Sequence, residues 1–473
     1  MLNLFDTRTR QAQPITPMDN QTVRFYCCGP TVYGPAHIGN FRTFVMQDVF
    51  RRVVELGGLP TTHVRNLTDV DDKTIRDSQK ANMSLNDFTD KWTKQFHHDC
   101  SELNCLAPHI EPSAVRHIPE QIEMVEALID KGHAYPSEDG SVYFKISSYP
   151  DYGKLSRLDE RELELGKTAN TRSSSDEYEK DSVADFVLWK SRKPEDGENY
   201  WTSPWGEGRP GWHLECSAMI HKYFGNNFDL HSGGVDLVFP HHENEIAQSR
   251  CACGGDFAKN WFHITHLLVD GGKMSKSLGN MYTLDDLKQK GYNASAVRYV
   301  LAGAYYRRPL NFTLSSLDDA KAALNRLKKF DTALAALCVE KDVPNYEQMR
   351  EIKPSLGEFT AAWQSLNNDL NTPEALGHVF SAIKRINVAD LSPEQAQEVR
   401  MAFHFILDAF GIVLPEEEKV QAAPAEVVQL ATQRWEAKQN KDWAAADTLR
   451  AQVTELGWTI KDGKDGFELI PNA

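Results

Sequence analysis

The chain has 473 residues and a formal net charge of -15 at pH 7, with 41% hydrophobic and 25% charged residues. This length is too great for one compact core and predicts two to four domains, while the composition is that of an ordinary globular protein. The negative charge argues against binding nucleic acid or membrane through bulk charge, and no apolar run approaches the roughly 18 residues of a membrane span, so we expect a cytoplasmic protein with no membrane partner.

The first predicted elements form a β–α–β unit. Thr22–Cys28 and Thr61–Leu67 are rich in β-forming residues, and Phe41–Leu56 carries apolar side chains at helical spacing. The loop His37-Ile38-Gly39-Asn40 precedes the helix, and the start of a helix after a strand is a natural phosphate site. His37 and Asn40 can both donate hydrogen bonds to phosphate oxygens, although a histidine before a helix is more often a cap or a surface residue.

The next part of the chain has the features of an insertion. Helical patterns dominate from Ser84 to Lys131, and Gly132–Ile146 predicts a hairpin that turns at Glu138-Asp139-Gly140. The polar run Thr171–Asp181 predicts a mobile loop. We expect Glu120–Ser203 to separate two halves of one nucleotide-binding sheet.

A candidate metal site follows the insertion. Cys216 lies on a predicted helix, and His241 and Glu245 are four residues apart, so they share one face of a second helix behind the predicted strand Phe228–His231. Sulfur, imidazole and carboxylate together predict zinc. The missing ligand must come from elsewhere, and Cys28, after the first strand, is the best candidate.

The residues leave alternatives open at this site. The eight cysteines lack the density of a disulfide framework, and free cysteines are also commonly inert core residues. Spacing alone does not choose between Cys27 and Cys28, nor between His241 and His242. The pair Cys251 and Cys253 has no further ligand at a suitable spacing, so we expect it not to bind metal.

A second phosphate loop follows the next predicted strand, His263–Val269. Two glycines precede Lys273-Met274-Ser275-Lys276-Ser277. Lysines neutralise the charge that develops on a departing pyrophosphate, and hydroxyls hold its oxygens. An isolated loop of this kind is more commonly a solvated basic segment.

From Tyr282 onward helical patterns predominate. Apolar residues at spacings of three, four and seven from Leu317 to Leu337 predict a face of a helical bundle, which continues over Phe359–Leu366, Ala375–Ile386 and Pro393–Phe410. An acidic, Ala/Pro-rich linker begins at Pro415. A small terminal unit then contains a helix capped by Asp442, with Ala446, Leu449, Val453 and Leu456 on one face, and a two-stranded ribbon over Trp458–Leu469.

Taken together, the two phosphate loops resemble the paired ATP signatures of the class I aminoacyl-tRNA synthetases. The surrounding segments resemble the cysteinyl-tRNA synthetase family within that class: Tyr26–Tyr33, Val64–Lys73, Gly208–Met219 and Phe239–Glu245, with weaker matches at Asp369–Pro373 and Asp442–Arg450. The likeness covers nearly the whole chain. The first signature ends in Asn40 where the family commonly has histidine, and asparagine remains a hydrogen-bond donor.

The resemblance implies an α/β fold: a Rossmann-like parallel-sheet catalytic domain split by an insertion, then an α-helical bundle and a small C-terminal α+β anticodon-binding unit. The implied domains are the first half of the catalytic domain (1–119), a connective insertion (120–203), the second half with the zinc site and the lysine–serine loop (204–280), a stem-contact region (281–315), a tRNA-binding helical bundle (316–414), and the linker with the anticodon-binding unit (415–473).

The resemblance also implies the reaction and its residues. L-cysteine and ATP, with Mg²⁺, give cysteinyl-adenylate, and the cysteinyl group then passes to the 3′ adenosine of tRNA(Cys). The implied ATP and catalytic residues are His37, Gly39, Asn40, Lys273 and Lys276, and the implied amino-acid pocket is Gly29, Thr31, Thr68 and Trp212. Family position selects Cys28, Cys216, His241 and Glu245 as ligands of one zinc ion, which would bind the substrate thiolate and so separate cysteine from serine.

A tRNA partner requires local basic surface on this acidic chain, and a monomer is expected. Arg298, Arg307, Arg308, Lys328, Lys329, Arg434, Lys438 and Lys441 are candidate phosphate contacts, although each is individually more typical of a solvated helix face. Two other functions fit part of the pattern: an ATP-dependent ligase that joins cysteine to an amino sugar, and a tRNA- or nucleotide-binding paralogue without catalysis. The long C-terminal half favours a tRNA enzyme.

Overall fold

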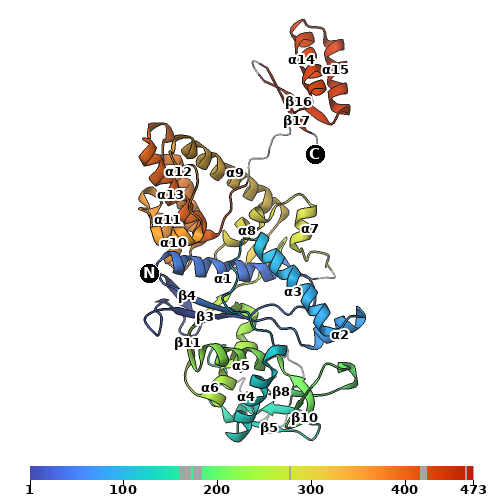
Figure 1. Cartoon of the computed structure of the whole chain (residues 1–473), viewed down its shortest axis with the longest axis vertical. Helices are drawn as coiled ribbons and strands as arrows, with labels where there is room; N and C mark the ends of the chain where they lie inside the picture. Colours follow the sequence, from blue (N-terminus) through green and yellow to red (C-terminus); the bar gives the residue numbers. More distant parts are fainter. Residues whose placement is uncertain (159–171, 174–183, 276–277, 416–422, 464–465, 472–473) are drawn as a thin grey trace. The chain divides into compact units, whose positions relative to one another are not determined.

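A computed structural model of the chain describes residues 1–158, 172–173, 184–275, 278–415, 423–463 and 466–471. The chain forms two compact units, Met1–Leu414 and Pro415–Ala473 (Figure 1). Among the described residues no helix is long and apolar enough to cross a membrane.

A four-stranded parallel sheet lies at the centre of the first unit, in the order β12-β11-β3-β4. Its strands are β3 (Val23–Cys27), β4 (Thr61–Arg65), β11 (Asn227–Gly234) and β12 (Phe257–Ile264). The predicted β–α–β unit is confirmed, because helix α1 (Ile38–Leu56) connects β3 to its parallel neighbour β4. The strands are buried almost throughout, as a parallel sheet covered on both faces requires.

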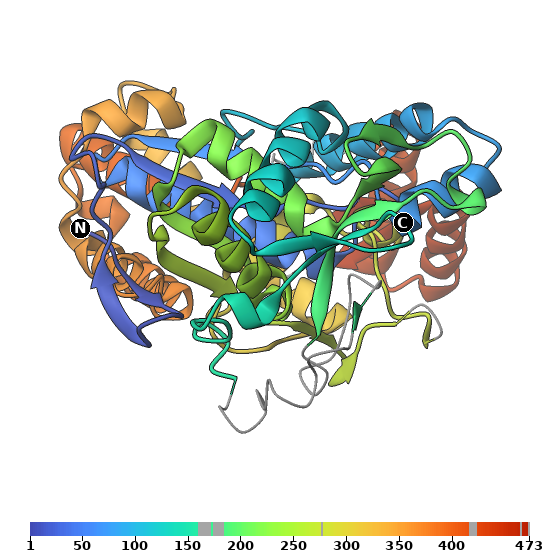
Figure 2. The ribbon, with the colours of Figure 1, turned by 90° about the horizontal axis from the view of Figure 1, so that it is seen from below.

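Helices cover both faces of this sheet (Figures 1 and 2). Helix α1 buries the predicted apolar face that includes Val45, Val49 and Val53. On the other face lie α5 (Trp212–Phe224) and α6 (His241–Cys253), which pack on each other. The sheet therefore joins chain segments about two hundred residues apart, and this is what assembles the site described below.

The insertion carries its own sheet, antiparallel in the order β5-β6-β8-β10-β9, with β7 parallel to β8. Its strands are β5 (Ala134–Pro136), β6 (Val142–Phe144), β7 (Arg172–Ser173), β8 (Asp185–Ser191), β9 (Trp201–Ser203) and β10 (Gly206–Pro210). The predicted hairpin is β5–β6. The predicted boundary after Ser203 falls between the paired strands β9 and β10. Of the predicted mobile loop Thr171–Asp181, only residues 172 and 173 lie within the described part of the chain.

The prediction of one strand over His263–Val269 is wrong. The structure has two strands there, the end of β12 and β13 (Leu267–Val269), which belong to different sheets. The chain leaves the central sheet at Thr265, whose N–H bonds to Tyr306 O, and β13 then pairs with β14 (Gly272–Lys273) and β15 (Leu310–Phe312). The apolar residues of this segment predict burial, and both strands are buried, so the sequence pattern did not indicate that the chain changes from one sheet to another.

The remaining elements of the first unit are mostly helical, as predicted. They are the hairpin β1 (Asn3–Asp6) and β2 (Gln11–Pro14), with α2 (Asp72–Lys80), α3 (Leu85–Glu102), α4 (Ile118–Asp130), α7 (Leu284–Gln289), α8 (Ala294–Ala302), α9 (Leu314–Leu337), α10 (Tyr346–Ile352), α11 (Thr360–Asn367), α12 (Thr372–Arg385) and α13 (Pro393–Phe410). In α9 the predicted bundle face is buried from Leu317 to Leu334, and Leu337 is partly buried.

The second unit is a small α+β structure. It contains α14 (Ala425–Gln439), α15 (Trp443–Glu455), β16 (Trp458–Asp462) and β17 (Phe467–Pro471). The predicted ribbon is confirmed as the antiparallel pair β16–β17. Asp442 caps α15 as predicted, since its side chain accepts a hydrogen bond from Ala445 N, but Leu456 is exposed rather than packed on the core.

A buried charge cluster ties α1 to the helices behind it. Asp48 Oδ2 accepts hydrogen bonds from Arg52 Nε at 2.7 Å and Arg298 Nη2 at 2.5 Å, and Asp48 Oδ1 accepts from Leu106 N at 2.7 Å. Arg298 also donates to Phe410 O. Burial opposes ionisation, but the charges of the two arginines hold the pKa of Asp48 below its usual value. Arg298, a candidate tRNA contact from the sequence, is instead a buried structural residue.

Replacing this carboxylate is expected to destabilise the first unit strongly. Asp48→Asn leaves Arg52 and Arg298 buried without a counter-charge, and we expect a loss of about 3–5 kcal/mol in the free energy of unfolding. Urea denaturation measures it. Asp77→Asn is the matched control: it removes a partly exposed carboxylate paired with Arg76, and should cost less than about 1 kcal/mol. Equal losses in the two variants would contradict the structural role of Asp48.

Candidate metal and nucleotide site

Four buried side chains converge where the central sheet meets α5 and α6. Cys28 directly follows β3, Cys216 lies in α5, and His241 and Glu245 lie in the first turns of α6. One ligand atom from each of the four lies within 4.8 Å of the other three. The four-residue spacing places His241 and Glu245 on one face of α6, and His241 Nε2 lies 2.8 Å from Glu245 Oε1.

The sheet register explains how the two cysteines meet. In the parallel pair β3–β11, Cys27 lies opposite Ser232, and Cys28 N donates to Ser232 O. Cys28 therefore lies beside the end of β11. Helix α5 immediately precedes β11 in the sequence and α6 follows it, which brings their ligands to the same place. The hydrogen bond from Cys28 lowers the pKa of the Cys216 thiol to about 6, against the effect of burial. Burial raises the pKa of Cys28 well above its ordinary value.

The other two members of the set carry opposite charges. Burial works against both charged forms, but the neighbouring charges outweigh it: those of His231 and His241 lower the pKa of Glu245 to about 2, and that of Glu245 raises the pKa of His241 to about 10. Glu245 and Cys216 thus give His241 an environment in which a cation is stabilised. Two sulfurs, one imidazole and one carboxylate suit zinc, so the residues present fit a divalent metal ion.

A second four-residue set overlaps the first. Cys28, His231, His242 and Glu245 also bring one ligand atom each within 4.8 Å of one another. His242 Nε2 lies 3.3 Å from Cys28 Sγ, and His231 Nε2 lies 2.6 Å from Glu245 Oε2. The described residues therefore contain a possible metal site with two alternative ligand sets, and only Cys216 and His241 distinguish the first from the second.

Histidines that the sequence analysis left unassigned surround the site. His242 Nδ1 lies 2.7 Å from His263 Nε2, and His263 Nδ1 lies 2.7 Å from Thr7 Oγ1. His213 Nδ1 lies 2.9 Å from His241 Nδ1, an outer contact of the kind that orients a ligating imidazole. Burial keeps the pKa of His242 well below its ordinary value and lowers that of His263 to about 3, so both are neutral.

The expected amino-acid pocket residues lie around the same point. A β carbon at Gly29 would stand 1.6 Å from Asn66 O, so only glycine lets these two backbones approach. Thr31 and Thr68 form a parallel bridge, and Thr68 Oγ1 donates to Glu215 Oε2 at 3.0 Å. The Trp212 ring packs on His241, with centroids 4.3 Å apart.

The two expected phosphate loops are adjacent in the structure. His37 is the N-cap of α1 and forms a reciprocal capping box with Asn40: His37 Nδ1 accepts from Asn40 N, and Asn40 Oδ1 accepts from His37 N. A β carbon at Gly39 would lie 2.2 Å from Met274 Cε. His37 also bridges Thr283, beyond the second loop. Capping and phosphate binding at His37 are therefore compatible, since both use the start of the helix.

The second loop is partly described. Lys273 ends β14 and is exposed, and its carbonyl oxygen accepts a hydrogen bond from the Asn280 side chain. Ser275 N donates to Asn280 Oδ1 at 2.9 Å. Lys276 lies outside the described residues, so its expected role at the reacting phosphate remains a prediction.

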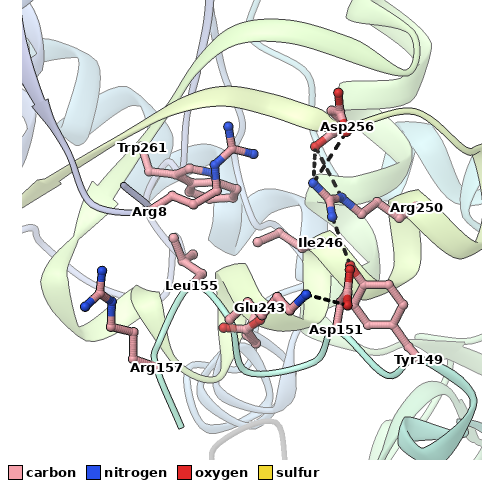
Figure 3. A pocket seen from close by; sticks show the side chains of 11 residues that line it. Arg8, Tyr149, Asp151, Leu155, Arg157, Glu243, Ile246, Arg250, Asp256 and Trp261 are labelled. Carbon is pink, nitrogen blue, oxygen red and sulfur yellow. Dashed lines mark hydrogen bonds and ion pairs between the residues drawn. The ribbon is translucent and has the colours of Figure 1, made fainter. Parts of the chain in front are cut away.

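A surface cavity of about 320 Å³ lies beside α6 (Figure 3). Glu243, Ile246 and Arg250 line it, and their spacing places them on the helix face away from His241 and Glu245. Its charges are largely matched: Glu243 accepts hydrogen bonds from Gly153 N and Ser156, and Arg250 bonds to Tyr149 and Asp256. Cys28, Cys216, His241 and Glu245 are not among the residues that line this cavity.

Several candidate tRNA-contacting side chains already have protein partners. Arg307 bonds to Asp369 Oδ2 at 2.9 Å and stacks on Phe5. In the second unit, buried Arg434 pairs with Asp462, as does Lys438. The solvated-face interpretation thus does not hold for Arg298 and Arg434, because both are buried. Any role of Arg308, Lys328, Lys329 and Lys441 toward tRNA stays a prediction.

The chain is similar to known proteins over nearly its whole length. The family described as the tRNA synthetases class I (C) catalytic domain matches residues 14–322, and the DALR domain matches residues 363–415. The chain is 52% identical to the cysteine–tRNA ligase of Opitutus terrae, over 99% of both chains, and 42% identical to that of Brachyspira hyodysenteriae, over 98% of both. Its fold is similar to that of Mycobacterium tuberculosis methionyl-tRNA synthetase in complex with methionyl-adenylate, with a TM-score of 0.56, 12% identity and coverage of 82% and 89% of the two chains.

Proposed function

Because the chain belongs to the cysteine–tRNA ligases, a family of class I aminoacyl-tRNA synthetases, we propose that it activates L-cysteine with ATP and Mg²⁺ and transfers the cysteinyl group to the 3′ adenosine of tRNA(Cys). The observation that carries the specificity for cysteine is the convergence of Cys28, Cys216, His241 and Glu245 in a buried site. We propose these four as ligands of one zinc ion.

The selectivity follows from the chemistry of the ligands. Cysteine and serine differ by one atom, and an apolar pocket separates such near-isosteres poorly. Zinc bound at this site would coordinate the substrate sulfur as a thiolate in preference to a neutral hydroxyl. The chain's own residues orient the ligands: His213 holds the His241 ring, His231 holds the second carboxylate oxygen of Glu245, and Trp212 covers the imidazole.

Adenylate formation requires positioning and charge neutralisation rather than covalent catalysis. His37 and Asn40, at the start of α1, would hold phosphate oxygens from one side of the nucleotide, and Gly39 lets Met274 of the second loop approach. Lys273 and Lys276 would neutralise the departing pyrophosphate from the other side. The contact of Gly39 with Met274 supports this, because it brings both loops to one place. Asn40 would keep the donor role that a histidine commonly has in the family.

The tRNA step is assigned to the C-terminal half. The helical bundle, of which residues 363–415 match the DALR domain, would bind tRNA, and the second unit would read the anticodon. We propose that the protein acts as a monomer, and that its tRNA contacts include the basic residues for which no buried partner is described, among them Arg308, Lys328, Lys329 and Lys441.

Pyrophosphate exchange tests this function. We expect exchange that depends on L-cysteine, followed by transfer of labelled cysteine to tRNA(Cys), and serine-dependent exchange slower by more than about 200-fold, the most that an apolar pocket supplies. Transfer only to an amino sugar would instead identify a small-molecule cysteine ligase. Absence of any exchange would identify a binding protein without catalysis.

A further inference from the structure

Glu215 is a buried glutamate to which the proposed function assigns no role. It lies in α5 between Trp212 and Cys216 and is fully buried. Its Oε2 accepts the hydrogen bond from Thr68 Oγ1, but its Oε1 has no hydrogen-bond partner. A buried unpaired acceptor is costly, about 1–3 kcal/mol, and needs a physical explanation.

The hydroxyl group of Thr68, like Glu215 Oε1, has an acceptor position left over. A hydroxyl has one donor and two acceptor positions. Its proton is committed to Glu215, and one acceptor position is used by Asn66 Nδ2 at 3.3 Å. Asn66 is itself held by Gly29 N, which donates to Asn66 Oδ1 at 2.8 Å. Burial raises the pKa of Glu215 well above its ordinary value. When Glu215 is ionised, the pair Glu215–Thr68 still offers two acceptors and no donor.

The position of this pair matches one end of the amino-acid substrate. Glu215 is adjacent in sequence to Cys216, and Thr68 bridges Thr31, three residues after Cys28. In cysteine the amino nitrogen lies at most roughly 4 Å from the sulfur, from ordinary bond lengths. A substrate whose sulfur is held near Cys28 and Cys216 thus brings its ammonium group, with three N–H donors, close to these two acceptors.

We propose that Glu215 binds the α-ammonium group of the amino-acid substrate with its Oε1, and that its Oε2 fixes the Thr68 hydroxyl as a second acceptor for the same group. This inference rests on the proposed function and deepens it. The sulfur of the substrate is selected near Cys216 and its ammonium group near the neighbouring Glu215, so a thiol without the ammonium group is distinguished from cysteine.

Calorimetric titration with two ligands tests this assignment. L-cysteine carries the ammonium group, and 3-mercaptopropionate has the same thiol and carboxylate without it. In Glu215→Gln we expect the Kd for cysteine to rise by about 10-fold or more, the loss of a hydrogen bond to a charged group, while the Kd for 3-mercaptopropionate stays unchanged. A merely structural role would weaken both ligands equally, and that result, or no change in either, overturns the proposal.

A matched control uses another buried glutamate. Glu243 lies on α6 but faces away from the site and has full hydrogen bonding. The quantity compared is the Kd for 3-mercaptopropionate divided by the Kd for cysteine. Glu243→Gln is expected to leave this ratio as in the unmodified protein. If Glu215→Gln does not fold, Thr68 supplies the test: Thr68→Val is expected to reduce the ratio and Thr68→Ser to restore it, and equal ratios in the two variants would overturn the proposal.

The failure of this inference is distinguishable from the failure of the proposed function. Cysteine-dependent pyrophosphate exchange is measured first on the unmodified protein. Without that exchange the proposed function fails, and the ammonium assignment fails with it. With exchange present, an unchanged ratio of Kd values in Glu215→Gln removes the ammonium assignment alone.

Discussion

The Cys216→Ser variant is expected to lose its bound zinc and its cysteine-dependent pyrophosphate exchange together. Serine replaces a soft thiolate, whose pKa is lowered to about 6 in this site, by a neutral hydroxyl that binds zinc poorly. Loss of an outer supporting contact already costs metal sites about 10–100-fold in affinity or activity, so removal of a direct ligand should exceed that. Metal content by mass spectrometry and the exchange rate measure the two effects.

This substitution also separates the two overlapping ligand sets. Cys216 belongs to the set with His241 and is absent from the set with His231 and His242. If the Cys216→Ser protein keeps one tightly bound zinc ion, the ion must be assigned to the second ligand set. The matched control is Cys251→Ser, since Cys251 is also a buried thiol but lies in neither set, and this variant should keep both zinc and exchange.

The His37→Asn variant is expected to keep its stability and lose about 100-fold or more of its exchange rate, the usual cost of removing one donor to a developing oxyanion. Asparagine is as good an N-cap as any residue, so it preserves the start of α1 that the His37–Asn40 capping box now stabilises. The asparagine side chain is shorter than that of histidine and is used for the cap, so it does not reach the phosphate that the imidazole Nε2 would contact. Thermal unfolding and the exchange rate at saturating cysteine measure the two properties.

The control for this experiment removes a cap away from the nucleotide. Ser84 caps α3, and its hydroxyl accepts a hydrogen bond from Asp87 N at 3.1 Å. Ser84→Ala should cost about 1 kcal/mol of stability and leave exchange intact. If His37→Asn retains full exchange while His37→Ala loses both stability and exchange, His37 is a helix cap with no role in ATP binding.

The sequence predicted helices and strands, which depend on neighbouring residues, better than it predicted which strands pair with each other. The β–α–β unit was recognised because α1 has a 3.6-residue pattern between two short β-rich runs. The strand prediction over His263–Val269 failed because periodicity reports burial and carries no information about the partner of a strand. Here β12 pairs in the central sheet and β13 in another.

The candidate site shows the same division. The relation of His241 to Glu245 follows from helix geometry and needed no tertiary information. By contrast, the spacing left Cys27 and Cys28 as equal candidates. The structure separates them: Cys28 has its Sγ 3.3 Å from His242 Nε2 and 3.8 Å from Glu245 Oε1, whereas Cys27 packs in the apolar core beneath α1.

Glu215, His213, His231 and His263 illustrate what no linear pattern could identify. Each stands in a helix or strand with no ligand-like spacing to the others, and each acquires its meaning from residues far along the chain, such as Thr68 for Glu215 and Thr7 for His263. Arg298 is the opposite case: it looked available for tRNA, but its burial against Asp48 assigns it to the interior.

The sequence by itself determined the kind of protein, most of the helices and strands, and the pairs of residues related by one turn of helix, because those depend on local periodicity and on motifs that are contiguous in the chain. Only the tertiary structure decided which thiol faces the histidines, which carboxylate oxygen is left without a partner, and which arginine is buried. The physical reason is that the register of β3 against β11 brings residues about two hundred positions apart into contact, and contacts at that separation leave no periodic trace in the sequence.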